Sequence, residues 1–242
     1  MALLSEEDVR RMSGNGTRGP VVVRRDQVLT PGARDYLRRH QVEVVYPQGK
    51  AGEGEAPAPR YQTLFGAVLS EKPEHMTHLR GNLLVFKDHP RIAFRGRIDA
   101  LEAELLLAQH AAAEEGLHGL AEELEEVLTF VRRFIRFDVL EEPVGEVRLC
   151  GYGPDELREH SHYPEQYYGQ GHFLPHYTDG PALLALNKVR TAVRQTELAA
   201  YAAFRGDGGG VTRPDILLGL NRLSSLLWIM MIKRKAGRYE RS

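Results

Sequence analysis

The stretch LAEELEEVLTFVRRFIRFDVL, residues 120–140, decides the fold class of this chain. Its apolar residues recur every three or four positions, at Leu120, Leu124, Val127, Val131 and Ile135. An α-helix turns once in 3.6 residues, so this spacing places them on one face. The stretch therefore predicts a long helix with one apolar face.

Three further segments predict long helices. They are residues 97–115, which are followed by Gly116, residues 181–205, and a last helix from about Thr212 to about residue 234. A short helix is expected at 154–162. Long helices joined by short connections predict a mainly α fold, namely a four- or five-helix, ferritin-like bundle.

A small N-terminal α/β appendage is expected ahead of the bundle. Residues 21–23 and 42–46 are rich in valine and predict strands, while Thr30 and Pro31 predict the start of a helix between them. The segment 47–60 is rich in Gly, Pro and Ala, which is typical of a flexible linker. We therefore expect three parts, which are residues 1–46, 47–60 and 61–242.

The composition is that of an ordinary soluble globular protein, with 42% apolar and 27% charged residues among 242. The net charge of −1 does not suggest nucleic-acid binding, so an anion must be recognised by a local cluster. Cys150 is the only cysteine, which excludes an internal disulfide and a multi-cysteine zinc site and favours the cytoplasm. We expect no signal peptide. The apolar segment 216–232 contains Arg222, which favours a buried helix over a membrane span.

The predicted helix 181–205 carries a charged stripe. Arg190, Arg194 and Glu197 recur at i, i+4 and i+7, so they share one face. One interpretation is a solvated face, on which ion pairs stabilise little. The other is an anion clamp, because two guanidinium groups on one ridge suit a polyphosphate. The sequence of this helix alone leaves both interpretations open.

The last helix carries a polar face that raises the same question. Asn221, Ser224, Ser225 and Trp228 lie along it. If they are buried, these groups need partners. The partners are either neighbouring helices or a ligand.

A third cluster precedes the 97–115 helix. It contains the cations Lys87, Arg91, Arg95 and Arg97. Asp99 follows in the expected first turn, where a carboxylate favours the helix electrostatically. The cations ahead of it suit an anion site at a helix N-terminus.

Four motifs occur in order along the chain. K-x-x-P-R-[IV]-x(3)-G-x-[ILV]-D-x-L runs from Lys87 to Leu101, HFLP occupies 172–175, R-x(3)-R-x(2)-E is the charged stripe, and NRLS occupies 221–224. In that order they resemble the bundle-type ATP:corrinoid adenosyltransferases. The segments KPEHMTHL (72–79), LTPGARDYL and RPDILLGLNRLSS look most like the ethanolamine-utilisation branch. The resemblance covers about residues 20–235.

The resemblance implies transfer of the 5′-deoxyadenosyl group of ATP to Co(I) of a reduced corrinoid, which gives adenosylcobalamin and triphosphate. It implies ATP, Mg²⁺ and cobalamin, and a cytoplasmic homo-oligomer with sites between subunits. A reductase partner and a microcompartment are left open. Because Co(I) is itself a strong nucleophile, the protein needs mainly to position ATP and to stabilise the charge that grows on triphosphate.

The resemblance also implies roles for individual residues. Asp99 is expected to form a salt bridge with Arg190, while Arg194 and Glu197 face ATP. Residues that match positions near the nucleotide or its phosphates are Lys87, Arg91, Asn221 and Arg222.

Two parts of the family pattern are less direct in this chain. The usual phosphate loop, T-K-x-G-D-x-G, is absent, and Thr77 and His78 in MTHLRGN are the local substitutes. In the loop 169–177, either His172 or Phe173 is expected to displace the lower axial ligand of cobalt.

Two rival interpretations remain. The missing phosphate loop motivates a non-catalytic corrinoid carrier or sensor on the same bundle. A bundle metalloprotein would use the histidines His160, His162, His172 and His176, whose irregular spacing argues against a common metal. The cysteine cluster of some ethanolamine-branch enzymes, H-x(11)-C-C-x(2)-C, is absent, so we expect no thiolate metal site.

Overall fold

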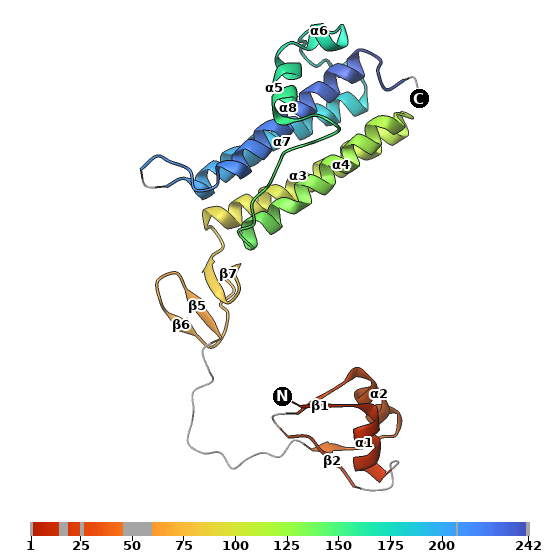
Figure 1. Cartoon of the computed structure of the whole chain (residues 1–242), viewed down its shortest axis with the longest axis vertical. Helices are drawn as coiled ribbons and strands as arrows, with labels where there is room; N and C mark the ends of the chain where they lie inside the picture. Colours follow the sequence, from red (N-terminus) through yellow and green to blue (C-terminus); the bar gives the residue numbers. More distant parts are fainter. Residues whose placement is uncertain (1, 15–18, 25–26, 46–59, 207, 241–242) are drawn as a thin grey trace. The chain divides into compact units, whose positions relative to one another are not determined.

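The chain divides into two compact units, Met1–Ala58 and Pro59–Ser242, and each is considered by itself. The structure is a computed structural model that describes residues 2–14, 19–24, 27–45, 60–206 and 208–240 (Figure 1). The predicted linker 47–60 lies outside the described residues, except for Arg60.

The described part of the first unit combines short strands with two helices. Its elements are β1 (Ala2–Leu4), α1 (Glu6–Ser13), β2 (Val21–Val22), β3 (Gln27–Leu29), α2 (Pro31–Arg39) and β4 (Val44–Val45). β1 pairs with β3 and β2 pairs with β4, both in parallel. The predicted helix start is confirmed, because Thr30 Oγ1 accepts the Ala33 N–H at 3.3 Å and Pro31 takes the first helical position. β1 and α1 were not predicted from the sequence.

The second unit begins with a four-stranded sheet that the sequence analysis did not predict. The strands β5 (Tyr61–Thr63), β6 (Val68–Leu69), β7 (Met76–Arg80) and β8 (Leu83–Phe86) lie in the order β6-β5-β8-β7. Arg95 joins this sheet to the helices, since its guanidinium donates to the carbonyls of His78 and Leu79 at 3.1 and 2.6 Å.

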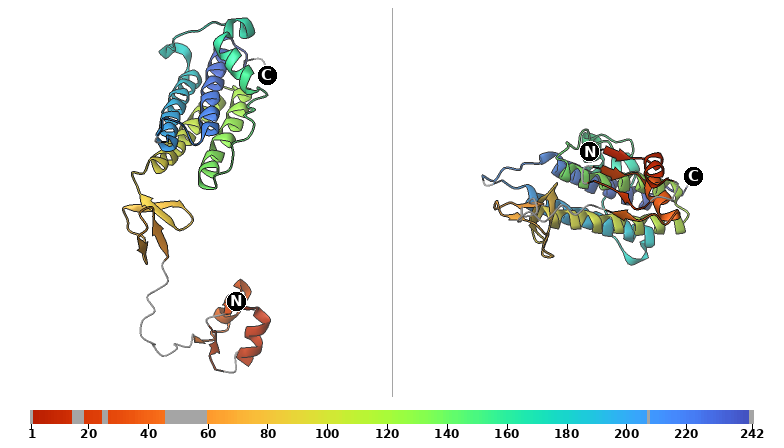
Figure 2. Two further views of the ribbon diagram at one scale, coloured as in Figure 1. Left: turned by 60° about the vertical axis from the view of Figure 1, so that its left-hand side comes forward. Right: turned by 90° about the horizontal axis from the view of Figure 1, so that it is seen from below.

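The long helices of the second unit are α3 (Pro90–Glu114), α4 (His118–Val139), α7 (Pro181–Phe204) and α8 (Pro214–Lys235) (Figure 2). They form the predicted bundle, and their apolar faces make one continuous core. α8 is long and apolar enough to cross a membrane by length and composition alone. Its buried residues lie in the bundle core, as the sequence predicted.

One prediction about α3 is wrong. The helix begins at Pro90, about seven residues before the expected start, because Pro90 suits the first position and the His89 ring accepts the Arg91 N–H at 3.1 Å. Arg91 and Arg97 therefore lie inside the helix, and Asp99 lies beyond its first turn. Of the four cations expected ahead of the helix, Lys87 alone precedes α3.

The connections are not all short. Residues 140–153 run back along the bundle from the end of α4 to α5 (Pro154–His162), and they bury Val144, Val147 and Leu149 (Figure 1). α6 (Pro164–Tyr168) and η2 (Tyr177–Asp179) follow before α7. One long crossover among four helices is the topology of ferritin-like bundles.

Gly219 is expected to be intolerant of a side chain. A Cβ at this position would lie 3.1 Å from Cζ of Phe134 and 3.4 Å from Cζ of Phe130 on α4. Gly219→Val should lower the free energy of unfolding by about 1–3 kcal/mol, because the rings must move to admit the new methyl groups. Urea denaturation followed by circular dichroism measures this. Leu218→Val at the exposed neighbouring position is the control, and equal stability of both variants would contradict the packing argument.

Candidate functional site

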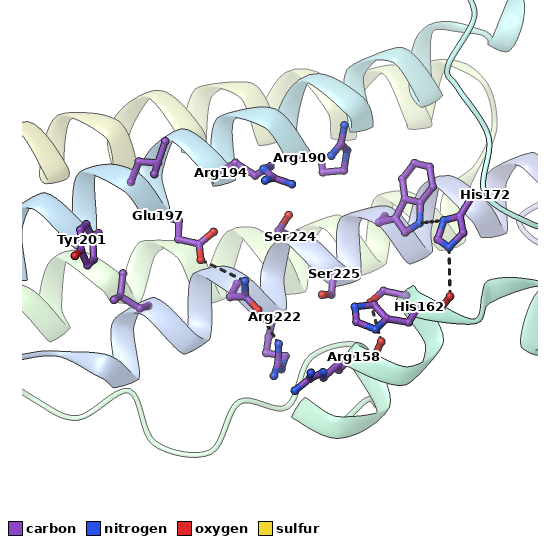
Figure 3. A pocket seen from close by; sticks show the side chains of 15 residues that line it. Arg158, His162, His172, Arg190, Arg194, Glu197, Tyr201, Arg222, Ser224 and Ser225 are labelled. Atoms are coloured by element: carbon purple, nitrogen blue, oxygen red, sulfur yellow. Dashed lines mark hydrogen bonds between the residues drawn. The ribbon is translucent and has the colours of Figure 1, made fainter. Parts of the chain in front are cut away.

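A cavity of about 830 Å³ lies between α5, α7 and α8 (Figure 3). Its walls combine four arginines, two histidines, several hydroxyl groups and an apolar portion. The lining residues are Arg158, Ser161, His162, His172, Arg190, Arg194, Glu197, Leu198, Tyr201, Leu217, Asn221, Arg222, Ser224, Ser225 and Trp228.

The charge in this cavity is strongly unbalanced. Four guanidinium groups line it, whereas Glu197 is the one carboxylate among the lining residues. Within the described part of the chain, the guanidinium groups of Arg158 and Arg194 have no hydrogen bond or ion pair. The Nε atoms of Arg190 and Arg222 are buried without an acceptor. Four cations beside one carboxylate, with two of the guanidinium groups unpaired, make this cavity suited to an anion.

Arg190 lies on α7 against the aromatic wall of the cavity. It donates one hydrogen bond, to Asn187 Oδ1 at 2.9 Å, and its guanidinium carbon lies 5.7 Å from the centre of the Trp228 ring system. Burial lowers the pKa of Arg190, and the neighbouring Arg194 charge lowers it further. A bound anion would raise the pKa of Arg190 again and so offset both effects.

The polar face of α8 turns toward the cavity. Asn221 donates to Glu197 Oε1 at 3.3 Å and accepts from Arg222 at 2.7 Å. These two hydrogen bonds connect α7 to α8 and hold the Arg222 guanidinium beside the Asn221 amide. Ser224 and Ser225 lie on the same wall. The charged stripe on α7 therefore lines a cavity, as expected for an anion clamp. The polar face of α8 lines the same cavity, as expected if its partner is a ligand.

His172 closes one end of the cavity. Its ring stacks on Trp228 with centroids 5.8 Å apart and planes inclined by 12°. Its Nδ1 accepts the indole N–H at 3.2 Å, so its Nε2 must carry the proton that faces the His162 carbonyl at 3.3 Å. Phe173 does not line the cavity, and it stacks on Trp228 at 5.3 Å instead.

The expected salt bridge between Asp99 and Arg190 is not formed within one chain. Asp99 is exposed on α3, whereas Arg190 faces the cavity between α7 and α8. Among the described residues, no ion pair joins the two side chains.

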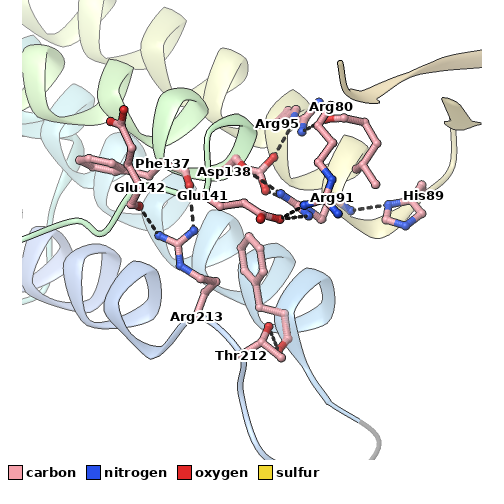
Figure 4. A network of polar contacts seen from close by, with 12 residues as sticks. Arg80, His89, Arg91, Arg95, Phe137, Asp138, Glu141, Glu142, Thr212 and Arg213 are labelled. Atoms are coloured by element: carbon pink, nitrogen blue, oxygen red, sulfur yellow. Dashed lines mark hydrogen bonds and ion pairs between the residues drawn. The ribbon is translucent and has the colours of Figure 1, made fainter. Parts of the chain in front are cut away.

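Four other residues expected near the phosphates do not line this cavity, namely Lys87, Arg91, Thr77 and His78. Arg91 is instead part of a network with Arg95 around Asp138, which is fully buried (Figure 4). Thr77 and His78 belong to β7. Lys87 lies 3.9 Å from Glu74.

α5 contributes three residues to the cavity that were not predicted from the sequence as binding residues. Arg158, Ser161 and His162 recur at i, i+3 and i+4, a spacing that places all three on one face of a helix. From the sequence, His162 was expected either to make polar contacts in a loop or, less favoured, to bind a metal. The spacing was visible, but nothing in the sequence showed that α5 packs against α8.

The described residues contain no group of three or more His, Cys, Asp or Glu side chains that could hold a metal. His160 stacks on Tyr167 at 3.7 Å and its Nδ1 lies 2.8 Å from the Tyr168 hydroxyl. The four clustered histidines therefore do not converge on one point.

Cys150 lies away from the cavity and is expected to be unreactive. Burial raises the pKa of Cys150 to about 12, and the nearby carboxylates of Glu123 and Glu126 add to the shift. At pH 8 the thiolate fraction is then on the order of 10⁻⁴. Labelling with a thiol-specific chromogenic reagent should be slow in the native protein and fast in urea. Fast native labelling would contradict the burial of this side chain.

Comparisons with known proteins agree on one family. The family model for cobalamin adenosyltransferase matches residues 67–234. Corrinoid adenosyltransferase EutT from Salmonella typhimurium is 32% identical over 224 residues, and that from Escherichia coli K12 is 33% identical over 224 residues. Each alignment covers 86% of this chain and 82% of the relative.

Two solved structures of variants of a PduO-type ATP:corrinoid adenosyltransferase from Lactobacillus reuteri are also similar. One is complexed with ATP and the other with cobalamin and ATP. Each has 22% sequence identity and a TM-score of 0.49 and covers 69% of this chain, with 91% and 88% of the solved chains covered.

Proposed function

This chain belongs to the cobalamin adenosyltransferase family, and we propose that it transfers the 5′-deoxyadenosyl group of ATP to the Co(I) centre of a reduced corrinoid. The observation that carries the proposal is the cavity in which four arginines face one carboxylate beside an aromatic wall. The arginines of such a cavity suit a polyphosphate, and its aromatic wall suits a flat macrocycle.

The reaction needs little from the protein in covalent terms. The electron pair of Co(I) attacks C5′ of ATP, the cobalt–carbon bond forms, and the C5′–O5′ bond breaks with its electron pair passing to the triphosphate. The protein contributes by holding C5′ in line with cobalt and by stabilising the charge that grows on the leaving group.

Arg190 and Arg194 are the natural clamp for that leaving group. They lie one turn apart on α7 and both line the cavity. Arg194 has no partner within the described residues, so its fork of donors is free for phosphate oxygens. Glu197, one turn further along α7, positions Asn221 at 3.3 Å and faces the same space.

His172, rather than Phe173, is the residue that would meet the lower face of the corrinoid. Both of its ring nitrogens are already engaged, one by the Trp228 N–H and the other by the His162 carbonyl. A histidine held in this way has no free lone pair for cobalt. It therefore acts as a flat wall that excludes a lower ligand.

We also propose that a second copy of the chain completes the site. Asp99 is exposed and Arg190 has no ion pair within the described residues, so Asp99 of a second copy can bind one edge of the Arg190 guanidinium while its other donors face the triphosphate. Leu198, at the edge of the cavity, is largely exposed and offers an apolar contact. Residues around the sheet, such as Thr77 and Lys87, would then approach the cavity of the neighbouring copy. Light scattering of wild type and Asp99→Asn measures assembly, and a purely monomeric, fully active wild type would refute this arrangement.

Mg²⁺ fits the cavity as a companion of ATP. A magnesium ion commonly uses one or two carboxylates together with substrate phosphates, and Glu197 is the carboxylate present. When bound, the ion would neutralise part of the triphosphate charge. We place the reaction in the cytoplasm and in ethanolamine utilisation, as the EutT relatives suggest.

An absorbance assay tests the proposed function. The protein is incubated with ATP, Mg²⁺ and cobalamin under strongly reducing conditions, and formation of the cobalt–carbon bond is followed together with release of triphosphate. Both are expected in equal amounts. Cobalamin binding without ATP affinity or turnover would favour the alternative, a corrinoid carrier or sensor on the same bundle.

A further inference from the structure

The four arginines of the cavity fall into two pairs. Arg190 and Arg194 lie one turn apart on α7. Arg158 comes from α5 and Arg222 from α8, and Figure 3 shows their side chains extending toward one another on the opposite wall. Glu197 on α7 accepts from Asn221 on α8, which in turn accepts from Arg222.

The second pair has unused donors. Arg158 has no side-chain partner within the described residues. Arg222 donates to Asn221 Oδ1 through Nη1 at 2.7 Å, and within the described residues its Nη2 has no acceptor. Two guanidinium groups directed into one space repel each other unless an anion lies between them. The nearby hydroxyl group of Ser225 adds a further donor to this wall.

We propose that Arg158 and Arg222 form a second phosphate subsite, separate from the clamp of Arg190 and Arg194. This inference rests on the proposed function. Two substrate phosphates have the right chemistry, the triphosphate of ATP and the phosphodiester in the nucleotide loop of cobalamin. Guanidinium groups bind either one through paired, charge-assisted hydrogen bonds.

The position of α5 favours the phosphodiester. The same helix contributes the His162 carbonyl that holds His172, the wall for the lower face of the corrinoid. The nucleotide loop of cobalamin extends from that lower face when its base is not coordinated to cobalt. A phosphate recognised on α5 therefore lies on the side of the cavity where the loop would emerge.

The experiment compares two corrinoids that differ in this phosphate. Wild type, Arg158→Gln and Arg222→Gln are assayed with cobalamin and with cobinamide, which lacks the nucleotide loop. The KM for cobalamin should rise about 10-fold or more in both variants, as expected for a lost charged hydrogen bond. The KM values for cobinamide and ATP should stay unchanged. Arg205→Gln, an exposed arginine outside the cavity, is the matched control.

Each outcome bears on the proposal. If the KM for ATP rises with both corrinoids instead, the subsite stands and the triphosphate occupies it. If neither variant changes any KM, the subsite is refuted. Arg158→Gln is the cleaner variant, because it disturbs no hydrogen bond within the described residues, and circular dichroism checks that it is folded. A wild type inactive with both corrinoids would instead refute the proposed function.

Discussion

Arg194→Ala is expected to lower kcat by about 100-fold or more, the size of effect seen when a preorganised donor to a developing negative charge is lost. Arg194 lines the cavity and has no acceptor within the described residues, so its donors are free for the leaving triphosphate. Because that charge grows in the transition state, kcat should fall more than the affinity for ATP. Initial rates at saturating ATP and corrinoid measure the change.

Two further variants make this test specific. Arg194→Lys keeps the charge but loses the planar fork, so it should recover only part of the rate. Arg205→Ala removes an exposed arginine just beyond α7 and should leave the rate unchanged. Near-full activity in Arg194→Ala would show that the clamp is assigned to the wrong residue.

Asp138→Ala should be the most destabilising single change in the polar network at the base of α3. The Asp138 carboxylate is fully buried and accepts from Arg91 Nε and Arg95 Nε, each at 2.6 Å. The two arginine side chains are only 16% exposed. Removing the carboxylate leaves Arg95 without an ion pair and Arg91 with Glu141 alone, at 3.5 Å, a loss of about 3–5 kcal/mol in the free energy of unfolding.

Chemical denaturation of Asp138→Ala tests this expectation. Arg132→Ala, which breaks the more exposed pair between α3 and α4 formed with Glu102, is the control and should cost at most about 1 kcal/mol. Equal losses in both variants would contradict the argument from burial.

The same network yields a test of the phosphate role expected for Arg91. If Arg91 acts through Asp138, then Arg91→Ala should lower stability without a specific rise in the KM for ATP. A stable variant with a raised KM for ATP would favour the role implied by the family motif.

The sequence was sufficient for much of the bundle because helical periodicity is a local property. Apolar residues at intervals of three and four fixed the long helices to within a few residues at most ends. The start of α3 was misplaced because Pro90 and His89 form a cap outside the periodic apolar stretch. The strands β5 to β8 were missed because each is five residues or fewer and pairs across the chain.

The sequence by itself also determined that Arg190, Arg194 and Glu197 share one face of a helix. It likewise placed Asn221, Ser224, Ser225 and Trp228 on one face of the last helix. Only the tertiary structure decided which cations meet. It brought Arg158 from α5 into the cavity, and it committed Arg91 to the buried Asp138. The charge of an arginine in the sequence does not tell whether it binds a ligand or forms a structural ion pair. An arginine becomes a binding group or a structural one according to whether packing supplies it with a carboxylate or leaves its donors unpaired.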